Sequence, residues 1–187
     1  QGISETLSID FRTPLTLKNN QEEFEFIKNM NADLAIVVAY GQIIPEEFLK
    51  LTKNGFINIH GSLLPKWRGA APIQRSIMNL DNETGISIMK IIKELDSGPV
   101  NNTYRIKLDH SDNAQVISEK LSLLASQKIL DNVDALLDGT ANFVNQDPLQ
   151  ATYAKKIDKS EGRINWDDEA INIIGKINGL YPSPGAF

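Results

Sequence analysis

Residues 56–75 read FINIHGSLLPKWRGAAPIQR, and the expected architecture of the whole chain builds outward from them. The first five residues have the pattern of a short strand, so Asn58 and His60 point to one face while apolar neighbours anchor the strand. A loop follows, and Pro72 then opens a helix, where its missing N–H would have no partner anyway. Polar side chains at a strand end, before a loop and a helix, are where open α/β sheets bind ligands. The sequence therefore predicts an α/β fold with a site at Asn58 and His60.

The segment before this strand supplies a second strand and a helix. Residues 34–40 form a near-continuous aliphatic run, which is typical of a parallel strand covered on both faces. Pro45 then starts a helix with Glu46 and Glu47 in its first turn. Strand, helix and strand make a βαβ unit, in which both strands end at the same edge of the sheet. The loops 40–45 and 61–69 should therefore converge.

The segment after the helix that begins at Pro72 has the pattern of a hairpin. Residues 84–92 alternate polar and apolar side chains, as in a strand with one face toward the core. A Ser-Gly-Pro turn at residues 97–99 demands a reversal, and residues 102–108 form the returning strand. Asp96 stands at the mouth of this turn.

Helical patterns account for most of the rest. Residues 20–29 suggest a short helix, residues 112–138 one or two helices that Gly139 ends, and residues 168–177 a final helix. Residues 1–20 carry only a weak alternation followed by a loop.

Composition excludes several kinds of chemistry. The 187 residues contain no cysteine and two histidines, so disulfides, thiolate metal sites and a multi-histidine metal site are ruled out, and no metal is expected. No apolar run approaches the roughly 20 residues that cross a bilayer, and we expect a cytoplasmic protein.

The charge balance restricts how RNA could be bound. A net charge of −5 argues against a free-standing nucleic-acid binder. RNA contacts would have to be local, with Lys66, Arg68 and Arg75 as candidate cations and Trp67 available for stacking. Scattered solvated cations are an equally good interpretation.

The motif carries a family resemblance. The string Asn58-Ile59-His60-Gly61-Ser62-Leu63-Leu64-Pro65 resembles the signature of formyltransferases that use 10-formyltetrahydrofolate. Its continuation, residues 66–75, looks like the branch that formylates methionyl-tRNA, and residues 163–166 and 182–186 are similar to that branch as well. The resemblance implies a Rossmann-like core with a mostly parallel sheet flanked by helices. It also implies formyl transfer to initiator methionyl-tRNA in translation initiation, by a monomer.

The resemblance also assigns catalytic roles. Asn58, His60 and Asp96 match the family's catalytic residues. Asn58 and His60 would donate hydrogen bonds to the oxyanion that forms when an amine attacks a formyl carbon, often the largest catalytic contribution. Asp96 would hydrogen-bond His60, stabilise its charged form and accept the amine proton.

Two loops are implied in binding 10-formyltetrahydrofolate. One side of the slot would be formed by Tyr40, Gly41, Gln42, Ile43 and Ile44, and the other by Ser62, Leu63, Leu64 and Pro65. A core role for the two isoleucines remains open.

The chain departs from the family in length and at one position. Family members are longer, so we interpret residues 1–150 as a partial catalytic domain, incomplete at its N-terminus. Residues 151–187 would form its end and a connection to a missing C-terminal barrel domain. Asn178 stands where many relatives have arginine.

Three alternatives remain. They are a formyltransferase for a sugar nucleotide or purine precursor, a non-catalytic folate-binding fragment, and a Rossmann oxidoreductase. Residues 67–75 disfavour the first, and the last is disfavoured because no Gly-x-Gly-x-x-Gly follows a strand.

Overall fold

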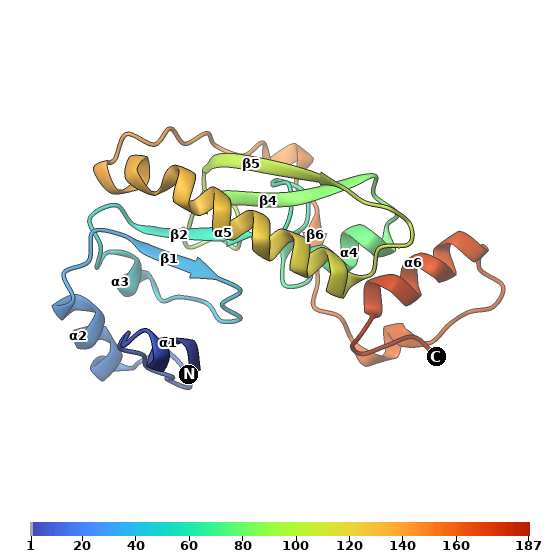
Figure 1. The fold of residues 1–187 in the computed structure, drawn as a ribbon, viewed down its shortest axis with the longest axis horizontal. Helices are drawn as coiled ribbons and strands as arrows, with labels where there is room; N and C mark the ends of the chain where they lie inside the picture. The colour runs from blue at the N-terminus through green and yellow to red at the C-terminus, as the bar shows by residue number, and fades with distance from the viewer. Residues whose placement is uncertain (1) are drawn as a thin grey trace.

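Four strands form the central sheet of the structure, a computed structural model that describes residues 2–187 and leaves Gln1 outside the described part. Their order is β1 (Ala35–Val38), β2 (Phe56–His60), β4 (Glu83–Lys90) and β5 (Val100–Lys107). β1 and β2 pair in parallel, whereas β2–β4 and β4–β5 are antiparallel (Figure 1). The predicted α/β fold and the hairpin are confirmed. The sheet is mixed, because the chain turns back through β4 and β5 without a crossover helix.

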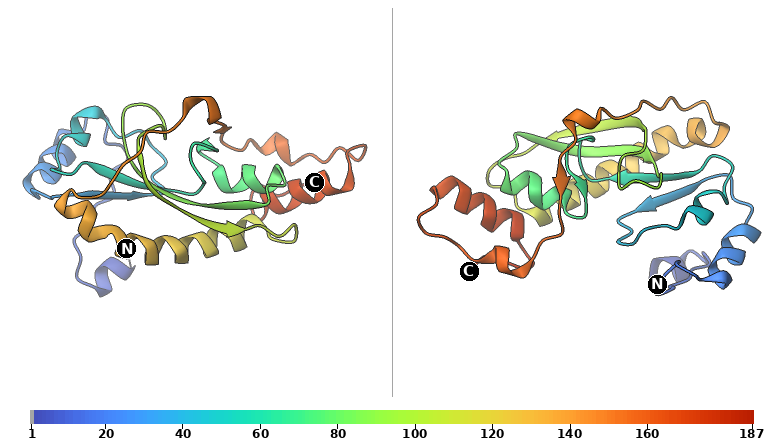
Figure 2. Two further views of the ribbon diagram at one scale, coloured as in Figure 1. Left: turned by 90° about the horizontal axis from the view of Figure 1, so that it is seen from above. Right: turned by 180° about the vertical axis from the view of Figure 1, so that it is seen from behind.

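Helices cover both faces of this sheet. They are α1 (Gly2–Thr6), α2 (Gln21–Asn29), α3 (Glu46–Leu49), α4 (Pro72–Met78), α5 (Ala114–Asp138) and α6 (Ala170–Leu180), with short 3-10 turns at Pro148–Gln150 and Lys159–Gly162. α5 crosses one face, and α2 and α3 lie on the other (Figure 2). α6 lies at the end of the molecule opposite α1 and α2. No helix within residues 2–187 is long and apolar enough to span a membrane.

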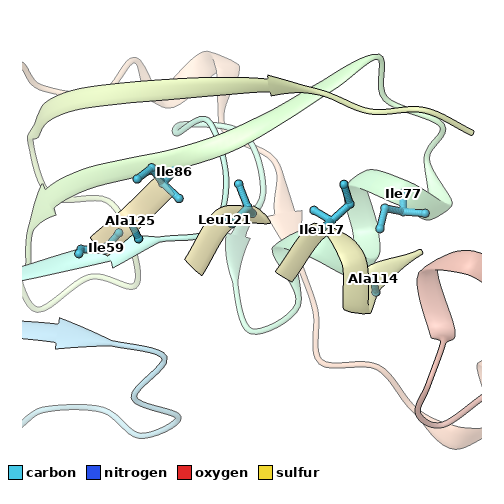
Figure 3. Close-up of a cluster of buried hydrophobic side chains, with 7 residues drawn as sticks. All are labelled: Ile59, Ile77, Ile86, Ala114, Ile117, Leu121 and Ala125. Atoms are coloured by element: carbon cyan, nitrogen blue, oxygen red, sulfur yellow. The ribbon is translucent and has the colours of Figure 1, made fainter. Parts of the chain in front are cut away.

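The larger core lies under α5 (Figure 3). Ile59 and Ile86 from the sheet pack against Ile117 and Leu121 of α5, with Ile77 of α4 alongside. One continuous helix of 25 residues forms this layer, which resolves the choice between one and two helices. The side chain of Asn113 caps its start, and Gly139 ends it in the left-handed conformation, as expected.

The opposite face carries a smaller core. Phe48 of α3 and Phe56 of β2 are buried there together with Leu17. The rings of Phe24 and Phe48 meet edge to face, with centroids 5.4 Å apart. This cluster fixes α2 and α3 against β1 and β2.

Burial of the strands differs from the sequence prediction in two places. β1 was expected to be covered on both faces, but Ile36 and Val38 are 45% and 59% exposed, because β1 is an edge strand and one of its faces is uncovered. β4 was expected to be half-buried, but residues 84–89 are all buried, because β4 lies between β2 and β5 and the loop after β2 covers its second face. The Ser87 hydroxyl donates to the Ser62 carbonyl at 2.7 Å across this contact.

Smaller elements also differ. α1 and the two-residue strands β3 (Arg68–Gly69) and β6 (Tyr153–Ala154), which pair in parallel, had no signal in the sequence. Pro45 is the cap of α3 and not its first residue. The Asn178 amide donates to the His110 carbonyl at 2.8 Å and so ties α6 to the loop before α5.

Candidate active site

Successive side chains of β2 point to opposite faces of the sheet. Ile59 points toward α5, whereas Phe56 packs in the opposite core. Asn58 and His60 share the parity of Phe56 along the strand, so they lie on the face away from α5. Asn58 and His60 therefore lie on one face of β2, as predicted.

His60 is held by two groups on different loops. Its ring is 6% exposed, and Nε2 lies 2.8 Å from the carbonyl oxygen of Trp67. A carbonyl oxygen only accepts, so Nε2 carries a proton and donates it. Trp67 presents this carbonyl from the left-handed region, at a φ of 63°. Nδ1, on the other side of the ring, lies 3.7 Å from Oδ2 of Asp96.

Asp96 reaches the site from the turn between β4 and β5. Its side chain is 15% exposed, and its Oδ2 accepts a hydrogen bond from the Gly69 N–H at 2.8 Å. The structure thus brings the Asp96 carboxylate and the His60 ring together, but the 3.7 Å between Oδ2 and Nδ1 is longer than the hydrogen bond that the resemblance implied. The hydrogen bond that this oxygen does make is the one from Gly69.

Asn58 offers a free carboxamide beside this pair. It is half-buried, and its side chain makes no hydrogen bond to any residue in the described range 2–187. An amide in a partly buried position needs a partner. Asn58 is therefore available to donate to a bound molecule.

The segment 91–96 lines the same face of β2. Ile91 N–H donates to the Phe56 carbonyl at 2.7 Å, and the segment ends at Asp96 beside His60, so it runs alongside Asn58. Ile92 and Leu95 on it are 39% and 62% exposed. Sequence reasoning missed these two residues; apolar side chains in a short loop before Asp96 were the available signal.

The loop after β1 presents further apolar groups. Ile43 is 83% exposed and Tyr40 39% exposed, and partial burial raises the pKa of the Tyr40 hydroxyl. The Gln42 amide donates to the Leu15 carbonyl at 2.9 Å, which fixes the loop, while Gly41 is exposed. Ile44 packs against the Phe48 core, so the core interpretation holds for Ile44 but not for Ile43.

The segment Ser62–Pro65 packs largely against the protein itself. Ser62 is fully buried and Leu64 is 8% exposed, because the turn packs onto β4 and the Ser62 hydroxyl donates to the Lys66 carbonyl at 2.6 Å. Protein atoms therefore surround both side chains, and a folate contact of this segment stays a prediction. Leu63 instead lines a separate cavity of about 680 Å³ with Lys66, Trp67 and Thr84, and Pro65 is half-buried in the turn.

The three cations proposed to contact RNA are engaged within the protein. Lys66 pairs with Asp81 at 2.8 Å, and Trp67 donates its ring N–H to the same carboxylate at 2.7 Å. Arg75 pairs with Glu161 at 2.6 Å, which lowers the pKa of that carboxyl. Arg68 is buried and bonds to Gln146. Within residues 2–187, no cluster of three or more His, Cys, Asp or Glu side chains could hold a metal.

Fold and site together define a Rossmann-like α/β protein with a polar site along one sheet strand. The chain belongs to the formyl transferase family: the Formyl transferase profile matches residues 11–133. A second profile, Formyl transferase, C-terminal domain, matches residues 156–187, within the segment expected to form the connection.

Sequence relatives point to one branch of this family. The chain is 66% identical over 187 residues to a methionyl-tRNA formyltransferase of Pelagibacter ubique, covering 100% of the chain and 60% of the relative. It is 43% identical over 174 residues to the methionyl-tRNA formyltransferase of Dictyoglomus turgidum, covering 93% and 55%. The chain thus spans a little over half the length of these relatives.

A solved structure supports the fold. HypX from Aquifex aeolicus, in complex with tetrahydrofolic acid, superposes with a TM-score of 0.76 at 18% identity, covering 89% of this chain and 29% of HypX. At this identity the similarity concerns the fold.

Proposed function

We propose that the protein transfers a formyl group from 10-formyltetrahydrofolate to the amino group of methionine on initiator methionyl-tRNA. One observation carries the proposal: the His60 Nδ1 and Asp96 Oδ2 atoms lie 3.7 Å apart, on the face of β2 where the Asn58 amide has no protein partner within residues 2–187. The names of the two relatives support the choice of substrate.

The three side chains fit the charges of this reaction. Attack of the amine on the formyl carbon places negative charge on the formyl oxygen, and donors aimed at that oxygen lower the barrier. The Asn58 amide is a free donor, and His60 becomes a second donor when Nδ1 is protonated. Asp96 stabilises that imidazolium and can accept the proton that the amine loses. The surrounding burial strengthens each interaction.

Exposed apolar groups flank these residues and suit the flat ring system of a folate. Ile43 and Tyr40 lie on the loop after β1, and Ile92 and Leu95 lie on the segment that runs beside Asn58. We propose that these four side chains bind the pteridine, because ligand sites combine apolar walls with a few polar groups. Gly41 and Gln42 would contribute through the backbone of the same loop.

RNA contacts are proposed near β6. Arg75, Tyr153, Lys155, Lys156 and Glu161 line a cavity of about 400 Å³. Lys155 and Lys156 are exposed, and the Tyr153 ring is 60% exposed, so this surface offers both cations and a stacking ring. A monomer acting in the cytoplasm remains our prediction.

The test requires a protein of full length. Residues 1–187 replace the matching 60% of the Pelagibacter ubique relative, and the chimera is assayed for formylation of methionyl-tRNA with 10-formyltetrahydrofolate. We expect activity that His60→Ala abolishes. His110→Ala is the matched control, because His110 is exposed and lies outside the site.

Two results would overturn the proposal. One is wild-type turnover by His60→Ala. The other is a folded chimera that formylates an amino-sugar nucleotide and leaves methionyl-tRNA unchanged.

A further inference from the structure

We propose that Gln146 is a positioning residue that holds Asp96 against His60, and that Arg68 fixes the orientation of the Gln146 amide. The inference rests on the proposed function. It concerns a residue that the family resemblance did not single out and that lies far from Asp96 in the sequence.

The Gln146 side chain uses its whole hydrogen-bonding capacity at this turn. Its Nε2 donates to the carbonyl oxygens of Asp96 at 2.9 Å and Gly98 at 2.7 Å. Its Oε1 accepts from the Nε and Nη2 atoms of Arg68 at 3.0 and 2.8 Å. An amide has two N–H donors and one oxygen, so rotation by 180° would place the oxygen against two carbonyls and the NH₂ against a cation. The orientation of Gln146 is therefore unique.

Arg68 is an unusual partner for a glutamine. Arg68 is 6% exposed, and no carboxylate of the described residues lies within ion-pair distance of its guanidinium group. Removing a guanidinium from water is costly unless its environment compensates for it. Here the compensation is the bidentate contact with Gln146, which indicates that this contact is strongly specified.

Backbone hydrogen bonds fix the two segments that carry Gln146 and Arg68. Val100, at the start of β5, exchanges two 2.8 Å hydrogen bonds with Val144, which brings the Gln146 segment to the turn that contains Asp96. Arg68 N–H donates to the Thr152 carbonyl at 2.8 Å, as part of the β3–β6 pair. Two segments distant in sequence thus meet at Gln146.

The turn that they hold needs support. Asp96 has a φ of 45°, in the left-handed region that is less favourable than φ < 0 for residues with a side chain, although aspartate adopts it more readily than most. Its carboxylate lies between the Gly69 N–H at 2.8 Å and His60 Nδ1 at 3.7 Å. Gly69 directly follows Arg68, so one segment supplies the donor to the carboxylate and the cation that orients Gln146. Loss of Gln146 would leave two carbonyls without their donor and let the carboxylate move.

The decisive variant is Gln146→Glu in the full-length chimera. Glutamate keeps the shape and the Arg68 contact, but it sets an oxygen against the Asp96 and Gly98 carbonyls. We expect kcat to fall about 10- to 100-fold, since a misplacement of about 1 Å can cost that much, with KM for both substrates nearly unchanged. Gln146→Ala should give a loss of the same order without the added charge. Gln127→Glu, at an exposed position of α5, is the charge-matched control and should leave kcat unchanged.

A second measurement separates positioning from general stability. In an Asp96→Asn background, Gln146→Glu should cost little more, because the group that it positions has already been removed. The ¹⁵N signals of the His60 ring should also change in Gln146→Glu and not in Gln127→Glu, and this readout does not depend on whether methionyl-tRNA is the substrate. Wild-type kcat in Gln146→Glu, or a full additional loss in the Asp96→Asn background, would overturn the assignment.

Discussion

His60 Nε2 lies 2.8 Å from the carbonyl oxygen of Trp67, and this contact decides what the other ring nitrogen can do. With Nε2 committed as a donor, neutral His60 has only a lone pair at Nδ1, facing the Asp96 carboxylate. A proton added at Nδ1 would turn this nitrogen into a donor that faces the carboxylate. In the proposed reaction the proton that the amine loses passes to the Asp96 carboxylate, which faces Nδ1.

Asn58→Ala should lower kcat by about 10²- to 10³-fold, which is the loss typical of one oxyanion donor. The carboxamide has no partner in residues 2–187, so little stability should be lost. Single-turnover formyl transfer in the chimera measures the chemical step directly. Asn172→Ala, at an exposed site on α6, should behave as wild type. An unchanged single-turnover rate in Asn58→Ala would remove Asn58 from the mechanism.

Gly98→Ala should destabilise the protein by about 1–3 kcal/mol or more, as overpacking does. A Cβ at Gly98 would lie 1.9 Å from the Lys90 carbonyl oxygen, so the turn that carries Asp96 would have to move. Urea unfolding measures the stability, and formyl transfer should fall with it. In Gly41→Ala nothing lies within 4 Å of the new Cβ, so its unfolding midpoint should match wild type. Equal midpoints for Gly98→Ala and Gly41→Ala would contradict the observed packing.

Glu161→Gln should lower stability at pH 7 by about 1–2 kcal/mol, because Arg75 donates to the carboxylate and a hydrogen bond to a charged group exceeds a neutral one. The pKa of Glu161 is lowered in the folded protein. Its contribution is therefore present above the unfolded pKa of about 4.3 and is lost as the pH falls through the folded pKa. Unfolding curves of both proteins between pH 7 and 3 should converge at the acidic end. A difference that stays constant over that range would refute the pair.

Thr84→Val should raise stability, by about 1 kcal/mol, because the Thr84 hydroxyl is the one buried side-chain oxygen or nitrogen in the described residues without a hydrogen-bond partner. Valine keeps the shape and removes the desolvated group. The thermal unfolding midpoint is the measurement. A lower midpoint for Thr84→Val would mean that the hydroxyl is paired in solution.

Much of the fold could be predicted from the sequence, because the residue patterns that specify its strands, helix ends and turns are local. The β2 strand with Asn58 and His60 on one face, the Pro72 helix start and the Gly139 helix end all follow from residue types at fixed spacing. The hairpin that presents Asp96 was predicted from its Ser-Gly-Pro turn.

What the sequence did not reveal depends on distant pairing. β3 and β6 contain two residues each, too few to show a period, and they pair across a long separation in the chain. Gln146 lies in an irregular segment, and nothing local connects it with Asp96. The burial of Ser62 and Leu64 was not predicted either, because packing of their loop onto β4 is a tertiary property.

The central claim is that His60 and Asp96 act as one unit, and a double-mutant cycle tests it most directly. Single-turnover formyl transfer to methionyl-tRNA is measured in the chimera with His60→Ala, Asp96→Asn and both substitutions. We predict strong non-additivity, with the double variant about as slow as the slower single variant, as for groups that act together. Losses that multiply fully, as for two independent residues, would contradict the account.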